Sequence, residues 1–185
     1  MKASNNVYHQ FIEFEEKAAS IYLRLASHFS SDRELSWFWF GMAMEEKEHA
    51  GLLQFCVQEE LFAPDLPTHS EVERMDRLFK DLERRAADKK LTLEESFSLA
   101  IELETSEVNA IYCHLTKALH NSPYLLKRKI ATVVPNHIDG LVAAACRFGV
   151  GDEILKQANR LRNNCSQDSD SADATCPESQ FGGRL

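Results

Sequence analysis

The chain has 185 residues, and its 21 Lys and Arg against 29 Asp and Glu give a formal net charge of −8 at pH 7. It contains only 7 Gly and 5 Pro, which argues against an all-β sandwich or barrel, because such folds need frequent turns. The acid excess disfavours nucleic acid and anionic membranes as partners. The sequence contains no run of about 18 apolar residues, which is the length that a membrane-spanning helix needs.

Apolar residues recur at steps of three and four through most of the chain, which is the period of an amphipathic helix. Ser31 with Glu34, and Thr92 with Glu95, have the spacing of capping boxes and mark two helix starts. Pro135 falls inside a further helical segment. The predicted helices cover approximately residues 5–29, 31–60, 70–88, 93–120, 123–148 and 152–162.

Four of these segments are long, the charged one at 70–88 is typical of a surface crossover, and that at 152–162 is short. The sequence therefore predicts an all-α fold in which residues 1–162 form a four-helix bundle. Residues 163–185 are rich in Ser, Asp and Ala without an apolar period, so we expect a disordered acidic tail. The polar N-terminal segment lacks the apolar core of a signal peptide, so we expect a cytoplasmic protein.

Carboxylates interrupt the apolar faces of three predicted helices. Glu15 lies on the apolar face of the first, Glu46 and His49 are spaced i, i+3 on the second, and Glu104 and Glu107 lie on the fourth. A buried carboxylate costs several kcal/mol unless it is paired or bound to metal. Because Lys and Arg are sparse on these faces, we expect a metal ion to supply the positive charge. Oxygen and imidazole ligands suit iron or manganese.

An internal repeat relates the first and fourth predicted helices, since the segment 12–22 is similar to 101–112. A matching repeat of Glu46-x-x-His49 is then expected in the next long helix. Alignment of the histidines places His137 there, with Val134 at the position of the glutamate.

The sequence over residues 5–148 resembles the rubrerythrin branch of the ferritin-like superfamily. The resemblance is carried by Glu15 with Tyr22, by the run Glu-Glu-Lys-Glu-His-Ala at 45–50, and by Glu-Thr-Ser-Glu at 104–107 with Tyr112. It implies a non-haem di-iron centre that reduces peroxide or oxidises ferrous iron with dioxygen or peroxide. The implied metal ligands are Glu15, Glu46, His49, Glu104, Glu107 and His137. Tyr22 and Tyr112 are expected to hydrogen-bond ligand carboxylates.

Two departures from the family pattern leave alternatives open. Val134 replaces a carboxylate that bridges the metals in the family, and Pro135 is expected to kink the helix there, so one iron is possible instead of two. Manganese or zinc could replace iron. With no C-x-x-C pair for a rubredoxin-like module, an oxidoreductase of this type needs an external electron donor. The alternative is a metal-binding, storage or sensing bundle without turnover.

Four consecutive aromatic residues occupy positions 37–40, at the start of the second predicted helix. They cannot all face one core, because successive residues of a helix point in directions about 100° apart. We therefore expect some of them to lie in the interface of a homodimer.

Overall fold

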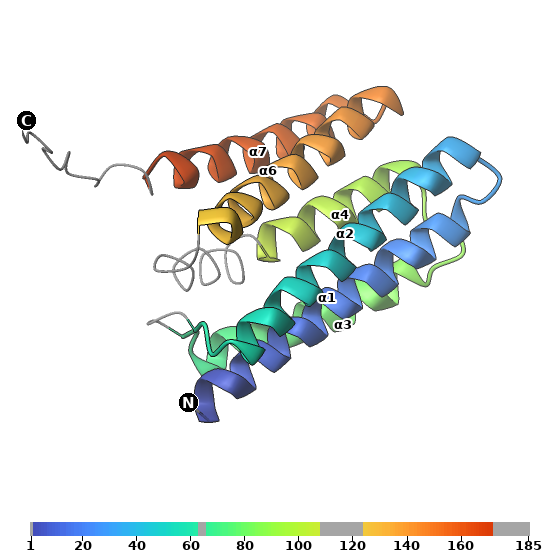
Figure 1. Ribbon diagram of the computed structural model, residues 1–185. Coiled ribbons are helices and arrows are strands. Elements are labelled where there is room, and N and C mark those ends of the chain that lie inside the picture. Colours follow the sequence, from blue (N-terminus) through green and yellow to red (C-terminus); the bar gives the residue numbers. More distant parts are fainter. Residues whose placement is uncertain (1, 63–65, 108–123, 172–185) are drawn as a thin grey trace, which may run out of the picture.

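The computed structural model describes the backbone of residues 2–62, 66–107 and 124–171, and the side chains of 6–62, 66–106 and 136–163. In these ranges the regular secondary structure is entirely helical, which confirms the all-α prediction (Figure 1). The helices are α1 (Lys2–His28), α2 (Arg33–Gln58), α3 (His69–Ala86), α4 (Leu93–Glu107), α6 (Tyr124–Arg147) and α7 (Asp152–Ser171). None of the described helices has both the length and the apolar character needed to span a membrane.

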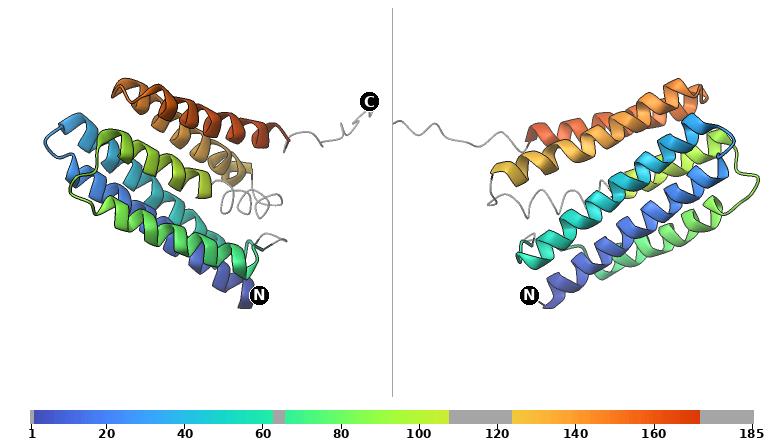
Figure 2. Two further views of the ribbon diagram at one scale, coloured as in Figure 1. Left: turned by 180° about the vertical axis from the view of Figure 1, so that it is seen from behind. Right: turned by 45° about the vertical axis from the view of Figure 1, so that its right-hand side comes forward.

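The helices run side by side, with α2 and α4 between the α1–α3 pair and the α6–α7 pair (Figures 1 and 2). Helices α1 and α2 form an antiparallel hairpin with the most extensive contact in the described chain, and α6 with α7 forms a second hairpin. Helix α3 packs on α1 and α4, and α4 also contacts α7. This arrangement surrounds the middle of α2 with three other helices that carry titratable side chains.

Helix α3 is packed more deeply than its charged sequence suggests. Its apolar residues recur at three- and four-residue spacing, so they form one buried stripe while the charges face outward. The Phe79 ring stacks on Phe14 of α1 with centroids 5.0 Å apart. The buried residues of the stripe are Val72, Met75, Phe79, Leu82 and Ala86.

The two predicted capping boxes have different outcomes. At the start of α4, the N–H of Thr92 donates to the Glu95 carboxylate at 2.8 Å and the N–H of Glu95 donates to Thr92 Oγ1 at 3.2 Å, as predicted. At the start of α2, the cap is Asp32, and the prediction of Ser31 with Glu34 is wrong by one residue. The Asp32 carboxylate accepts from the N–H of Leu35 at 3.1 Å, and its negative charge interacts favourably with the helix dipole.

The last described helix is longer than predicted. Helix α7 continues to Ser171, beyond the expected end at residue 162, so the described part of the predicted tail is helical. Ala158 and Leu161 are buried, and once packing has formed the first turns, each further residue adds a hydrogen bond at little cost. Residues 172–185, and the predicted helix ends at 120 and 123, lie outside the described residues.

The aromatic run at the start of α2 divides between core and surface, as its helical geometry requires. Trp39 is completely buried and Phe38 stacks on Phe97 of α4, with ring centroids 5.9 Å apart. Trp37 and Phe40 instead remain 59% and 39% exposed, and their rings touch edge to face. The run therefore anchors α2 in the core and also leaves an apolar strip on the surface.

Candidate metal centre

Helices α1, α2, α4 and α6 each turn titratable side chains into the interior at the same level. Glu15, Glu46, Glu104 and His137 are at most 3% exposed, and the His49 side chain is 11% exposed. We call these five residues the buried cluster. It unites residues that are up to 122 positions apart, and it contains two groups with ligand atoms close enough to hold a metal ion.

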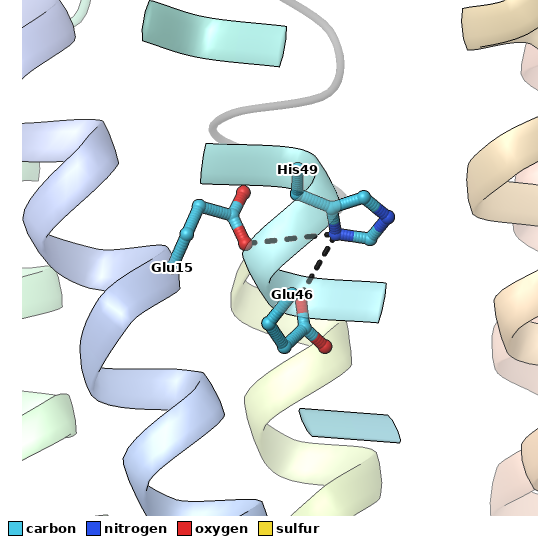
Figure 3. A group of neighbouring side chains, drawn as sticks. All are labelled: Glu15, Glu46 and His49. Atoms are coloured by element: carbon cyan, nitrogen blue, oxygen red, sulfur yellow. Dashed lines mark hydrogen bonds and ion pairs between the residues drawn. The ribbon is translucent and has the colours of Figure 1, made fainter. Parts of the chain in front are cut away.

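The first group consists of Glu15, Glu46 and His49 (Figure 3). The i, i+3 spacing on α2 brings His49 Nδ1 to 2.8 Å from Glu46 Oε2. Glu15 reaches the same nitrogen from α1, with its Oε2 at 3.6 Å. The three ligand atoms lie within 4.8 Å of one another, a separation that suits coordination of one ion by all three.

The second group consists of Glu46, Glu104 and His137. His137 Nε2 lies 2.8 Å from Glu104 Oε1 and 3.0 Å from Glu46 Oε1. Glu46 therefore belongs to both groups, with Oε2 facing His49 and Oε1 facing His137. A carboxylate that directs one oxygen to each of two sites has the geometry of a bridging ligand.

Tyr22 hydrogen-bonds a carboxylate of the cluster, as predicted, but the carboxylate belongs to another helix. Its hydroxyl donates to Glu104 Oε1 at 2.5 Å. The ring is fully buried and stacks on Trp39, with centroids 5.8 Å apart. Tyr22 thus fixes the Glu104 carboxylate through a buried hydrogen bond.

Burial and mutual attraction shift the pKa values of the first group strongly. Burial raises the pKa of Glu15 to about 8, despite the opposing attraction of His49. Burial disfavours the charged imidazole of His49, but the charge of Glu46 and the hydrogen bonds with both carboxylates raise its pKa to about 10. At neutral pH and without metal, Glu15 is thus protonated and His49 is a cation.

The residues of the second group show the same balance of forces. Burial alone would raise the pKa of Glu46, but the charges of His137 and His49 overcome this and hold it well below its usual range. The carboxylates of Glu104 and Glu46 raise the pKa of His137 well above its usual value, against the effect of burial. The metal-free cluster is therefore neutralised by two imidazolium ions and a protonated carboxyl.

This charge balance modifies the expectation that only a metal could supply the missing positive charge. In the described part of the chain, the ion pairs of Glu15, Glu46 and Glu104 are with histidines and none is with Lys or Arg. These ion pairs agree with the sparseness of Lys and Arg on these faces in the sequence. Protons on His49 and His137, which the sequence argument did not count, are the alternative to metal charge.

The unsatisfied polar atoms of the cluster fit a bound cation. Glu15 Oε2 and His49 Nε2 are buried without a hydrogen-bond partner among the described residues, and the contact of Glu46 Oε1 there is the ion pair with His137 at 3.0 Å. Buried polar atoms without partners are rare in folded proteins and call for an explanation such as an unseen ion or water. Two of these atoms are carboxylate oxygens of the two groups, and the donor set of oxygen and imidazole suits iron, manganese or zinc.

Some residues named from the sequence cannot be placed in the centre. The side chains of Glu107 and Val134, and all of Tyr112, lie outside the described residues. Helix α6 continues through Pro135, whose side chain is likewise not described. The exposed side chain of Asp139, two residues after His137 and on another side of α6, does not replace the carboxylate missing at position 134.

Glu45 is a contact of the centre that the sequence did not reveal. Its Oε2 lies 2.5 Å from His137 Nδ1, on the side of the ring opposite to Glu46 and Glu104. The side chain is half-exposed, so the apolar periodicity that singled out Glu46 gives no indication for its neighbour. Only the approach of α6 to α2 reveals the contact.

Comparisons of the chain with protein-family models, with curated proteins and with solved structures each found no match.

Proposed function

We propose that the buried cluster binds a pair of metal ions, iron in the first place, in a protein of rubrerythrin type. The observation that carries this proposal is the position of Glu46, which directs one carboxylate oxygen to each of two groups of possible ligands. An isolated buried ion pair does not need a carboxylate that is shared between two groups of ligands. A centre with two metal ions does need a shared carboxylate, because a negative charge between two cations reduces their mutual repulsion.

The helices that supply the cluster support a ferritin-like arrangement. In di-iron four-helix bundles, two helices give one Glu each and the other two give a Glu-x-x-His motif. We assign the single glutamates to α1 and α4 through Glu15 and Glu104, and the complete motif to α2 through Glu46 and His49. Helix α6 supplies the histidine of the second motif, His137, and has Val134 at the position of its glutamate. Helix α3 then serves as the crossover between the two halves.

The proposed reaction is the reduction of peroxide, or the oxidation of ferrous iron by peroxide or dioxygen. Iron would supply the electrons and act as a Lewis acid. The carboxylates of the cluster would balance its charge, and Tyr22 would hold Glu104 in place through its hydrogen bond. The fully buried ring of Trp39 stacks on Tyr22 and supports it in this position. Electrons for further turnovers would come from an external donor.

Anaerobic loading with ferrous iron tests this proposal. We expect close to two irons per chain, followed by oxidation that is faster with peroxide than with dioxygen and at least about 10-fold faster than free ferrous iron in buffer. Iron content after desalting and stopped-flow absorbance measure the two quantities. Two bound irons that react with neither oxidant faster than buffer would exclude the enzyme while leaving the metal site.

The second candidate function is a metal-binding, storage or sensing role without turnover. It is favoured by the charge balance of the metal-free cluster, in which His49 and His137 neutralise the carboxylates. Such a cluster is stable without metal, and a site that binds and releases metal reversibly requires this stability. One metal per chain, or preferential binding of zinc or manganese, would support this candidate over the oxidoreductase.

We also propose that the chain forms a homodimer through the exposed strip of α2. Trp37, Phe40 and Met44 follow one another at three- and four-residue spacing and are 59%, 39% and 42% exposed. Ala26 and Ser27 of the adjacent α1 line a surface hollow together with Trp37 and Phe40. Such a strip, which contains a large aromatic residue, is typical of the centre of a protein interface.

A Trp37→Lys substitution should weaken this association by more than about 10-fold, because an aromatic residue at the centre of an interface often contributes 2 kcal/mol or more. Sedimentation velocity over a range of concentrations measures the dimer dissociation constant. Arg24→Ala, which changes an exposed polar residue of α1, is the control. A wild-type chain that stays monomeric at high concentration would contradict the assignment.

A further inference from the structure

His137 is held on both sides by carboxylates, unlike the other histidine of the buried cluster. Its Nε2 faces Glu104 and Glu46 at 2.8 and 3.0 Å, whereas its Nδ1 faces Glu45 at 2.5 Å. His49 directs Nδ1 to the cluster, and its Nε2 is buried without a hydrogen-bond partner in the described chain. The two histidines therefore present different nitrogens to Glu46, and among the described residues a carboxylate lies behind His137 and none lies behind His49.

The location of Glu45 follows from its place beside Glu46 on α2. Successive residues of a helix point about 100° apart, so Glu46 faces the interior while Glu45 lies at the edge of the buried region. The Glu45 side chain is 50% exposed and that of His137 is 1% exposed. Glu45 thus reaches the ring from the solvent side and stays outside the group that would hold the metal.

We infer that Glu45 is a positioning residue that fixes the ring orientation and the tautomer of His137 for metal binding through Nε2. This inference rests on the proposed metal site. When a metal ion displaces the proton of Nε2, the imidazole of His137 keeps its Nδ1 proton, which it donates to Glu45, and directs the lone pair of Nε2 at the space shared with Glu46 and Glu104. Carboxylates that accept from the free N–H of a metal-bound histidine orient the ring and strengthen the ligand.

The asymmetry between the histidines has a measurable consequence. The His137 half of the cluster has a ligand whose geometry is set before metal arrives, so less free energy is spent on ordering it. The first metal equivalent should therefore bind at the half formed by Glu46, Glu104 and His137. Loss of the Glu45 carboxylate should weaken this first step and leave the step at Glu15 and His49 nearly unchanged.

Zinc titration of the full-length protein against a competing chelator tests this inference. We expect Glu45→Ala to weaken the tighter of two sites by about 10- to 100-fold, as is typical when a partner of a metal-bound histidine is lost. Glu45→Gln should have a smaller effect, because its amide oxygen still accepts from Nδ1–H. The control Glu48→Gln removes the same charge from an exposed residue three positions along α2 and should leave both affinities unchanged.

Long-range proton–nitrogen NMR correlations of the histidine rings add a readout that a merely structural role would not move. In the zinc-loaded wild type, His137 should carry its proton on Nδ1 and bind zinc through Nε2. In Glu45→Ala the Nδ1 proton should exchange much faster with water. Unchanged affinities together with an unchanged Nδ1 proton would overturn the inference alone, whereas a wild-type chain that binds no zinc would overturn the proposed metal site as well.

Discussion

Replacement of Glu46 by glutamine is expected to abolish metal binding at both halves of the buried cluster, whereas Glu15→Gln and Glu104→Gln should each remove one ion. Glu46 is the only described residue that belongs to both groups of possible ligands. Glutamine keeps the size of the side chain but loses the charge and one acceptor oxygen. Since loss of a mere partner of a ligand costs about 10- to 100-fold, loss of this shared ligand should cost more than about 100-fold at each site.

Metal content after equilibrium dialysis, with zinc and with anaerobic ferrous iron, distinguishes the three variants. Glu16→Gln is the matched control, because it removes an exposed carboxylate of α1 that pairs with Lys47. Circular dichroism establishes that each variant is folded. If Glu46→Gln retains one full equivalent of metal, the two groups are independent and the bridging role assigned to Glu46 is wrong.

The sequence predicted the members of the cluster because they break a regular pattern. Glu15, Glu46 and Glu104 occupy positions where the three- and four-residue period demands apolar residues, and all three are buried. His137 followed from the internal repeat rather than from periodicity, and it lies against Glu46 and Glu104. Local periodicity is reliable here because the apolar faces are long and Gly and Pro are scarce.

Contacts between helices could not be predicted in the same way. The Tyr22 hydroxyl donates a hydrogen bond to Glu104, which lies 82 residues further along the chain. The residue spacing within α1 does not show whether the acceptor is Glu104 or Glu15. The contact of Glu45 with His137 depends on how closely α6 approaches α2. The charge state of the cluster was missed for a related reason, since a histidine acquires its high pKa only when the carboxylates of other helices surround it.

The metal-free protein should lose stability as the pH rises from about 6 to about 9. A protein whose main ion pairs contain carboxylates of lowered pKa instead loses stability as the pH falls. The pKa of Glu15 is raised from 4.5 to about 8, and that of His49 from 6.5 to about 10. The pKa of His137 is raised as well. A group with a raised pKa stabilises the fold fully below its unfolded pKa, and this contribution disappears as the pH rises through its folded pKa.

The folded chain therefore holds more protons than the unfolded chain above about pH 4.5 because of Glu15, and the excess grows above about pH 6.5 because of His49 and His137. Each excess proton lowers the free energy of unfolding by about 1.4 kcal/mol per pH unit. The lowered pKa of Glu46 acts in the other direction, but its contribution is lost only on acidification below its unfolded value of 4.5. It does not compensate for the loss at high pH.

Metal binding should reverse this dependence, because a cation replaces the protons of Glu15, His49 and His137. Ligands must be deprotonated to bind, so metal affinity rises with pH and binding releases protons. Urea unfolding of the chelator-treated and zinc-loaded protein at several pH values measures both trends, and calorimetry in buffers of different ionisation enthalpy counts the protons released.

Glu15→Gln separates the two effects within one variant. Glutamine resembles the protonated carboxyl of Glu15, so above about pH 8 the metal-free variant should be more stable than the metal-free wild type, which must bury the charge. The same variant should gain less stability from zinc, because the group of Glu15, Glu46 and His49 has lost one of its two carboxylates. If instead it is less stable than the wild type at high pH without metal, the folded chain stabilises the Glu15 carboxylate, so the pKa of Glu15 is not raised and Glu15 is already ionised at neutral pH. In that case the two histidines do not balance the three carboxylates of the cluster, and the proton that we assign to Glu15 is not there for a metal ion to displace.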